Sequence, residues 1–243
     1  MRSFESSTKN NQADQPEVVP APEIPPESDT PSPVEGFALV FVCGVFFFGG
    51  ALLLSAADVF DARLVVTLQF AALLLPALLW AGYRGVSGRA FPAGKASGGT
   101  IAEAALWAVM GSLAAFLMAF VMTRWVGTEP ETEMLEKLIR EYPFSLQLLL
   151  FALVPAICEE LLFRGAFLAC LSRWHAPLAC LASAVMFGMF HGSLVRFFPS
   201  AALGFFLAVL VLRTRNIWLA VAAHGLHNGF VLWAMNAWGG EGL

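Results

Sequence analysis

The chain has 243 residues, of which 58% are hydrophobic and only 13% are charged, and its formal net charge is −4. Soluble domains carry about 25% charged and about 45–50% apolar residues. The composition therefore excludes an ordinary soluble domain and indicates a protein that crosses a lipid bilayer several times. With only 14 Lys and Arg in total, the chain offers no basic surface for nucleic acid.

The first 35 residues form a region of different composition. They hold seven of the fourteen prolines, and their seven acidic and two basic side chains give a net charge of −5. Such a segment cannot bury enough apolar surface to offset the entropy of ordering it. We expect a disordered, solvated tail over 1–35. It is not a cleavable signal, because no basic stretch directly precedes an apolar one.

Seven apolar segments follow, each long enough or nearly long enough to cross a bilayer as a helix, which takes about 20 residues. They lack the alternation of membrane β-strands. The sequence predicts an all-α polytopic membrane bundle of about seven to eight transmembrane helices. Residues 129–144 form an eighth, imperfect span or, as we prefer, a short amphipathic surface helix. The seven segments are 36–57, 63–82, 101–123, 145–171, 176–192, 197–213 and 216–238.

The four cysteines all fall in these apolar segments, and none has C-x-x-C spacing. We expect them to pack as small hydrophobic side chains rather than to form disulfides or bind metal. They are Cys43, Cys158, Cys170 and Cys180.

The loops between the segments indicate an orientation. The loop 83–100 is basic and holds no acidic residue, whereas the loop 124–144 is crowded with Glu. Because cytoplasmic loops carry an excess of Lys and Arg, we expect the N-terminus in the cytoplasm. With that orientation, eight Lys or Arg residues face the cytoplasm and five face the other side.

Ionisable residues inside membrane helices are costly and usually mark a functional site. The last four segments contain a short set of such residues, together with one asparagine: Glu159, Glu160, Arg164, His191, His224, His227 and Asn228.

Helix geometry groups them. Glu160 and Arg164 are four residues apart and share a face, so they can pair directly. Glu159 is rotated by about 100° from Glu160 and is left freer to act as a base. His224 and Asn228 also share a face. A Glu–Arg pair or a single histidine can instead serve only to hold helices together, and we favour this reading for His227.

Three motifs then resemble one family. "EELLFR" fits E-E-x-x-x-R, "FGMFH" fits F-x-x-x-H and "HGLHN" fits H-x-x-x-N, in that order on successive segments. They resemble the CPBP family of intramembrane proteases, which includes the CAAX prenyl endopeptidases and the Abi proteins. The resemblance covers about 145–238, which would be the catalytic core. The segment 36–144 would supply N-terminal transmembrane helices and loops.

The resemblance implies an endopeptidase embedded in the membrane, which would here be a bacterial cytoplasmic membrane. Its substrate would be a membrane-associated or lipidated, for example prenylated, protein. Glu159 would be the base that activates water, and His191 would help to hold that water. His224 and Asn228 would stabilise the oxyanion, while Glu160 and Arg164 would brace the site.

The sequence favours a reaction without a metal or other cofactor. A zinc site made of Glu159, His191 and His224 is the alternative, because two His and one Glu form a known catalytic zinc set. Two other functions also fit a polar cluster in a membrane bundle. One is a non-catalytic scaffold or immunity protein. The other is a proton- or ion-coupled transporter, although the chain shows no inverted repeat.

Overall fold

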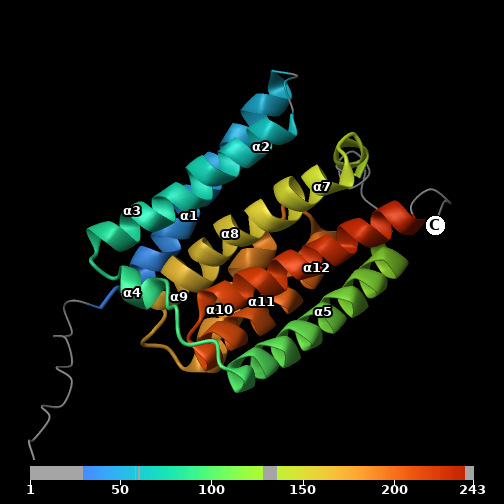
Figure 1. Cartoon of the computed structure of the whole chain (residues 1–243). Coiled ribbons are helices and arrows are strands. Elements are labelled where there is room, and N and C mark those ends of the chain that lie inside the picture. The colour runs from blue at the N-terminus through green and yellow to red at the C-terminus, as the bar shows by residue number, and fades with distance from the viewer. Residues whose placement is uncertain (1–29, 58, 60, 128–135, 239–243) are drawn as a thin grey trace, which may run out of the picture. The chain divides into compact units, whose positions relative to one another are not determined.

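The computed structural model describes residues 30–57, 59, 61–127 and 136–238, so most of the expected N-terminal tail lies outside the described residues. The described residues contain helices and no β-strand; one isolated bridge joins Ala93 and Asn216. Residues from Pro31 onward form one compact unit (Figure 1). The predicted all-α membrane bundle is confirmed, with six helices in the described residues that are long and apolar enough to cross a bilayer.

The first two spans form a hairpin. Helix α1 (Pro33–Ala56) begins three residues before the expected start, because Ser32 caps it and Glu35 completes a capping box. The second span, expected over 63–82, is continuous over 62–83. It consists of α2 (Ala62–Gln69), a π-helical segment η2 (Phe70–Leu74) and α3 (Leu75–Tyr83).

The third span is longer than expected. A short helix α4 (Ser87–Ala90) precedes α5 (Gly98–Val126), which Ser97 caps. Residues 136–140 are helical, so the C-terminal part of the expected surface helix is present, whereas 128–135 lie outside the described residues.

The fourth span is one continuous helix over Phe144–Cys170 that changes its winding twice. Pro155 lacks a backbone N–H and therefore removes a helical hydrogen bond just after a π-helical segment. In chain order the pieces are α7 (Phe144–Gln147), η3 (Leu148–Leu153), α8 (Val154–Glu160), η4 (Leu161–Phe167) and α9 (Leu168–Cys170).

The fifth expected span, 176–192, was predicted wrongly as a membrane-spanning helix. It forms α10 (Ala176–Met189), and its 14 residues are fewer than a spanning helix requires. Gly192 has a φ of 61°, a left-handed conformation that stops the helix and turns the chain. The chain then continues as α11 (Leu194–Thr214) and α12 (Ile217–Trp238).

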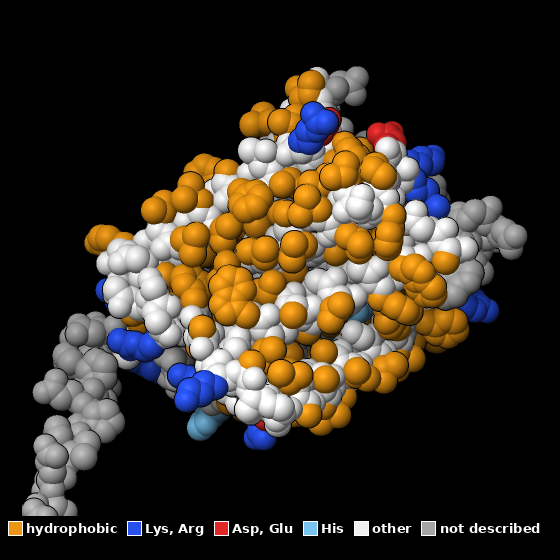
Figure 2. Space-filling model, in the orientation of Figure 1, with side chains coloured by type: hydrophobic (Ala, Val, Ile, Leu, Met, Phe, Trp, Pro, Cys, Tyr) orange, Lys and Arg blue, Asp and Glu red, His pale blue; other side chains and the backbone are white. Residues whose placement is uncertain are grey.

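The helices run roughly along a common direction and pack around the fourth span (Figure 1). The main buried core joins α1, the second span, the fourth span and α10, and it contains three of the four cysteines, Cys43, Cys158 and Cys180. All four cysteines are free and buried, as expected. In Figure 2 apolar side chains cover the middle of the visible face and Lys and Arg lie toward its two ends, as a lipid-facing surface requires.

Candidate active site

A cavity of about 570 Å³ lies between the N-terminal hairpin and the C-terminal helices. Its volume is within the range of about 300–1,000 Å³ that ligand pockets occupy. Most of its wall is apolar. The polar side chains cluster where α8, α10 and α12 meet, and four of the predicted site residues line it there: Glu159, His191, His224 and Asn228.

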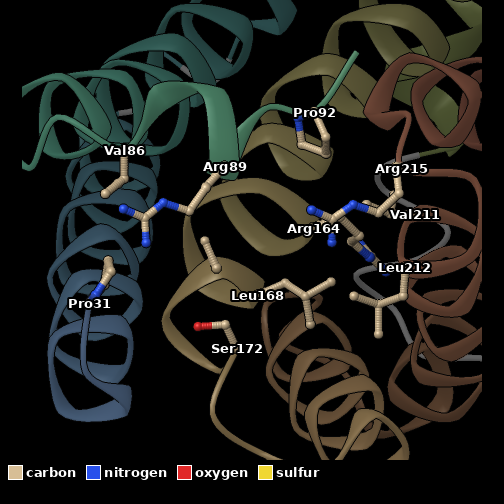
Figure 3. A pocket seen from close by; sticks show the side chains of 11 residues that line it. Pro31, Val86, Arg89, Pro92, Arg164, Leu168, Ser172, Val211, Leu212 and Arg215 are labelled. Carbon is tan, nitrogen blue, oxygen red and sulfur yellow. The ribbon is translucent and has the colours of Figure 1, made fainter. Parts of the chain in front are cut away.

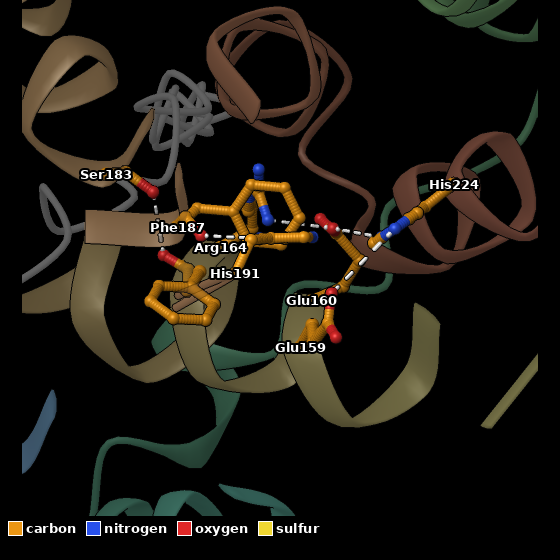
Figure 4. A network of polar contacts seen from close by, with 8 residues as sticks. Glu159, Glu160, Arg164, Ser183, Phe187, His191 and His224 are labelled. Atoms are coloured by element: carbon orange, nitrogen blue, oxygen red, sulfur yellow. Dashed lines mark hydrogen bonds and ion pairs between the residues drawn. The ribbon is translucent and has the colours of Figure 1, made fainter. Parts of the chain in front are cut away.

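Glu160 and Arg164 form the predicted ion pair. Nη1 of Arg164 donates to Oε1 of Glu160 over 2.8 Å, and neither side chain has any exposed area (Figure 4). The Arg164 guanidinium also lies 4.1 Å from the centre of the Phe187 ring, a cation–π contact. Neither Glu160 nor Arg164 lines the large cavity. The pair therefore lies behind the wall of the cavity and is not exposed to it.

His224 contacts the same carboxylate, which the sequence did not reveal. Its Nδ1 lies 2.9 Å from Oε1 of Glu160. A carboxylate that is paired with an arginine can only accept, so Nδ1 of His224 is the donor. This bond fixes the ring orientation and leaves Nε2 directed toward Glu159, at 3.8 Å from its Oε2. Glu160 thus positions His224 as well as pairing with Arg164.

Glu159 is the one of the two glutamates that faces the cavity. Its side chain is 17% exposed, whereas that of Glu160 is fully buried, and it lines the cavity. Oε2 of Glu159 lies 3.8 Å from Nε2 of His224, which is longer than a hydrogen bond. A gap of this size leaves room for a water molecule or a reacting group to contact both side chains.

His191 enters the cavity from the end of α10. Its Nδ1 lies 3.0 Å from the carbonyl oxygen of Phe187. Because a carbonyl only accepts, Nδ1 carries the proton, and Nε2 of a neutral ring is left as an acceptor. The Phe187 ring packs edge-on against both His191 and His224, with centroid distances of 5.0 and 5.6 Å. Phe187 therefore packs between the two histidines, and its ring face covers the Arg164 guanidinium.

The α12 helix supplies the remaining polar groups. Asn228 lines the cavity one turn from His224. His227 also borders the cavity, but its Nδ1 lies 3.1 Å from Oγ of Ser112 on α5, and its ring packs on Phe116. This contact between helices agrees with the structural role that we favoured for His227.

The residues considered as an alternative zinc set are Glu159, His191 and His224. Among the described residues, no three His, Cys, Asp or Glu side chains are grouped as a metal ion requires. We derive no step through a metal.

A second cavity, of about 130 Å³, lies between α4, α9 and α11 near the C-terminal end of the fourth span (Figure 3). Arg164 borders it together with Arg89 and Arg215, and none of its lining residues is acidic or a histidine. It lacks the groups that hydrolysis needs, so the large cavity is the candidate active site.

The paired glutamates and two histidines around an internal cavity are side-chain types that hydrolytic sites use. Comparisons with known proteins define the class further. Residues 142–230 match the family model described as Type II CAAX prenyl endopeptidase Rce1-like. The chain is also 33% identical over 109 residues to a Bacillus subtilis (strain 168) protein named "Putative membrane peptidase YdiL".

The match covers 44% of this chain and 44% of that relative, so the two are alike over less than half of their lengths. No solved structure matches the chain significantly. The similarity to the Rce1-like family lies in the C-terminal part of the chain, where the three motifs that resemble the CPBP family also lie. The matched region contains every predicted site residue.

Proposed function

We propose that this protein is an intramembrane endopeptidase in which Glu159 activates a water molecule. The observation that carries the proposal is the unequal environment of the two glutamates. Glu160 is buried and held by Arg164 and His224, whereas Glu159 faces a cavity large enough for a peptide segment. Two neighbouring carboxylates with different environments can take different roles.

In the first step, Glu159 removes a proton from water while the water oxygen attacks the carbonyl carbon of the scissile peptide bond. The Nε2 lone pair of His191 accepts a hydrogen bond from the same water and orients it. The C=O electron pair moves onto the oxygen to give a tetrahedral oxyanion.

The oxyanion needs donors aimed at its position. The Asn228 amide and, when its ring carries both protons, Nε2 of His224 supply them. Glu159 then passes its proton to the leaving nitrogen as the C–N bond breaks. The products are a carboxylate and an amine, and no cofactor enters the balance.

The substrate class follows from the site's surroundings. The cavity lies within a bundle whose outer surface is apolar, and its own wall is mostly apolar. We propose a membrane-associated or lipidated polypeptide as the partner, with a prenylated protein as one case, and the lipid bilayer as the working environment. A bacterial cytoplasmic membrane remains our proposed location.

The proposal is tested by Glu159→Gln in the full chain, reconstituted in lipid nanodiscs with a pool of fluorescence-quenched peptides. Loss of the base should lower the cleavage rate by about 10²- to 10⁴-fold or more. Glu103→Gln is the matched control, because Glu103 pairs with Arg213 far from the cavity, and it should cleave normally. Both variants should keep the elution volume of the folded wild-type protein.

Normal cleavage by Glu159→Gln would refute the role of Glu159. A folded wild-type chain that binds membrane peptides and cleaves none would favour a non-catalytic scaffold instead. Metal dependence is tested on the same preparation. We expect activity to survive chelation, and one bound zinc per active chain that is lost together with activity would refute the metal-free reaction.

A further inference from the structure

One polar side chain in the cavity wall is not explained by the catalytic groups. Gln69, at the C-terminal end of α2, lines the large cavity and is only 9% exposed. Its Oε1 is buried without a hydrogen-bond partner, and no side-chain hydrogen bond of Gln69 exists within the described residues. A buried amide that stays unpaired costs about 1–3 kcal/mol, so its presence requires a reason.

Thr67, a polar residue on the same helix, differs from Gln69 because its side chain has a hydrogen-bond partner. Thr67 lies on the exposed face of α2, and its Oγ1 donates to the carbonyl oxygen of Arg63 over 2.8 Å. Gln69 makes no such local hydrogen bond, and its Oε1 has no donor among the described residues. Its helix packs against α8, which carries Glu159, and both residues line one cavity. At Gln69 the helix also changes to the π-helical segment η2, a feature that is frequent at functional sites.

We propose that Gln69 binds the backbone of the substrate polypeptide, an inference that rests on the proposed function. A peptide that is to be cut must present its backbone N–H and C=O groups inside a mostly apolar cavity. There each unpaired group is costly, because little water is available to bind it. The side-chain amide of glutamine offers one acceptor and two donors, so it can satisfy both kinds of backbone group.

Gln69 would then be a substrate-binding residue that the N-terminal hairpin contributes. It lines the same cavity as the motif residues Glu159, His191 and His224. The amide would contact the bound peptide equally before and during the reaction. Its removal should therefore weaken binding without slowing the chemical step.

The test compares Gln69→Met with wild type in nanodiscs, using the quenched peptide that wild type cleaves best. We expect KM to rise about 5- to 30-fold, with kcat within about twofold of wild type. The melting temperature should not fall, because methionine replaces an unpaired buried amide by an apolar chain of similar length. Thr67→Val is the matched control and should leave KM, kcat and melting temperature unchanged.

A second measurement identifies the bonded atoms. A series of peptides, each N-methylated at one backbone nitrogen, removes one substrate donor at a time. One member should bind wild type more weakly than the parent peptide does, and that loss should vanish in Gln69→Met, because coupled groups do not add.

Three results separate the outcomes. If wild type cleaves no peptide, the proposed function fails, and this inference falls with it. If wild type cleaves but Gln69→Met has an unchanged KM and an unchanged N-methyl profile, Gln69 does not bind substrate. A fall in melting temperature with unchanged KM would assign Gln69 a structural role and would equally overturn the proposal.

Discussion

The chemistry of single residues centres on one buried carboxylate oxygen. Oε1 of Glu160 accepts hydrogen bonds from both Nη1 of Arg164 and Nδ1 of His224. A single oxygen atom thus connects the fourth span to α12. Arg164 has no exposed charge to share with water. A buried ion pair contributes little net stability as a pair, yet removal of one partner leaves an uncompensated charge.

Arg164→Leu should therefore destabilise the protein strongly. We expect a loss of about 3–5 kcal/mol in the free energy of unfolding, because Glu160 would remain buried without its cation. The double variant Glu160→Leu with Arg164→Leu should lose less than the sum of the two single variants. Unfolding in mixed detergent, followed by circular dichroism, measures these energies.

The exposed pair of Arg213 and Glu103 provides the control for that prediction. Its two side chains are 64% and 32% exposed, and the N–O distance is 2.7 Å. Arg213→Leu should cost about 1 kcal/mol or less. Equal losses in Arg164→Leu and Arg213→Leu would mean that burial does not govern the Glu160 pair.

Spacing along the chain was enough to predict the Glu160–Arg164 contact, because residues four apart in a helix are neighbours. It could not predict that His224 bonds Glu160, since the two lie 64 residues apart and meet only through packing. Gln69 was missed for another reason. The sequence signal was the ionisable residues of the last four segments, whereas Gln69 is uncharged and lies in the second segment.

At the scale of elements, proline and glycine decide where helices change. Pro76 and Pro155 each follow a π-helical segment, and both of these segments belong to spans that line the cavity. The expected spans were correct in place but not in winding, because hydropathy does not report which backbone bonds a proline removes. The fifth segment was predicted too long, because apolar residues continue beyond Met189 while Gly192 turns the chain.

Close contact between α10 and α11 makes Gly188 a sensitive position. A Cβ at this residue would lie 2.8 Å from the backbone oxygen of Phe197, which cannot move without shifting α11. We expect Gly188→Ala to destabilise the protein by about 1–3 kcal/mol, as overpacking does. It should also lower kcat, because His191 lies three residues further on. Unfolding in detergent and peptide cleavage measure the two effects.

Gly49→Ala is the matched control for Gly188→Ala. Gly49 lies in α1 and has nothing within 4 Å of an added Cβ. Alanine there should be neutral or should stabilise the helix by about 0.5–1 kcal/mol. If Gly188→Ala were as mild as Gly49→Ala, the two helices would not be as tightly packed as the structure shows.

The whole molecule has two different ends. At one end Arg84 pairs with Glu35, Arg213 pairs with Glu103, and Asn216 bonds the carbonyl of Gly94. At the other end Arg140 donates to the carbonyl of Met235. The large cavity extends toward the second end, because Ala51, Glu136 and Met235 line it there.

The difference between the two ends bears on the orientation of the protein in the membrane, and thereby on the side from which a substrate would enter. The first end carries the loop that is basic and free of acidic residues, and the small cavity with Arg89 and Arg215. The positive-inside rule assigns such an end to the cytoplasm. The large cavity would then open toward the opposite face of the membrane. Sequence could suggest the orientation, but only the packed structure shows toward which end the cavity extends.

We therefore expect a cysteine at Val59 to react with a membrane-impermeant maleimide in intact cells, and one at Ala96 to react only after lysis. Both positions are exposed and lie in loops at the two ends. The four native cysteines are buried, so the unmodified chain should label weakly and serves as the background control.

The labelling pattern decides between substrate classes. A protein that is lipidated on the cytoplasmic side can be a substrate only if the cavity opens on that side. Labelling of Val59→Cys in intact cells would direct the search toward membrane proteins cut near their outer ends. The reverse pattern, with Ala96→Cys labelled first, would contradict the orientation and place the cavity opening where a cytoplasmic lipidated chain can enter it.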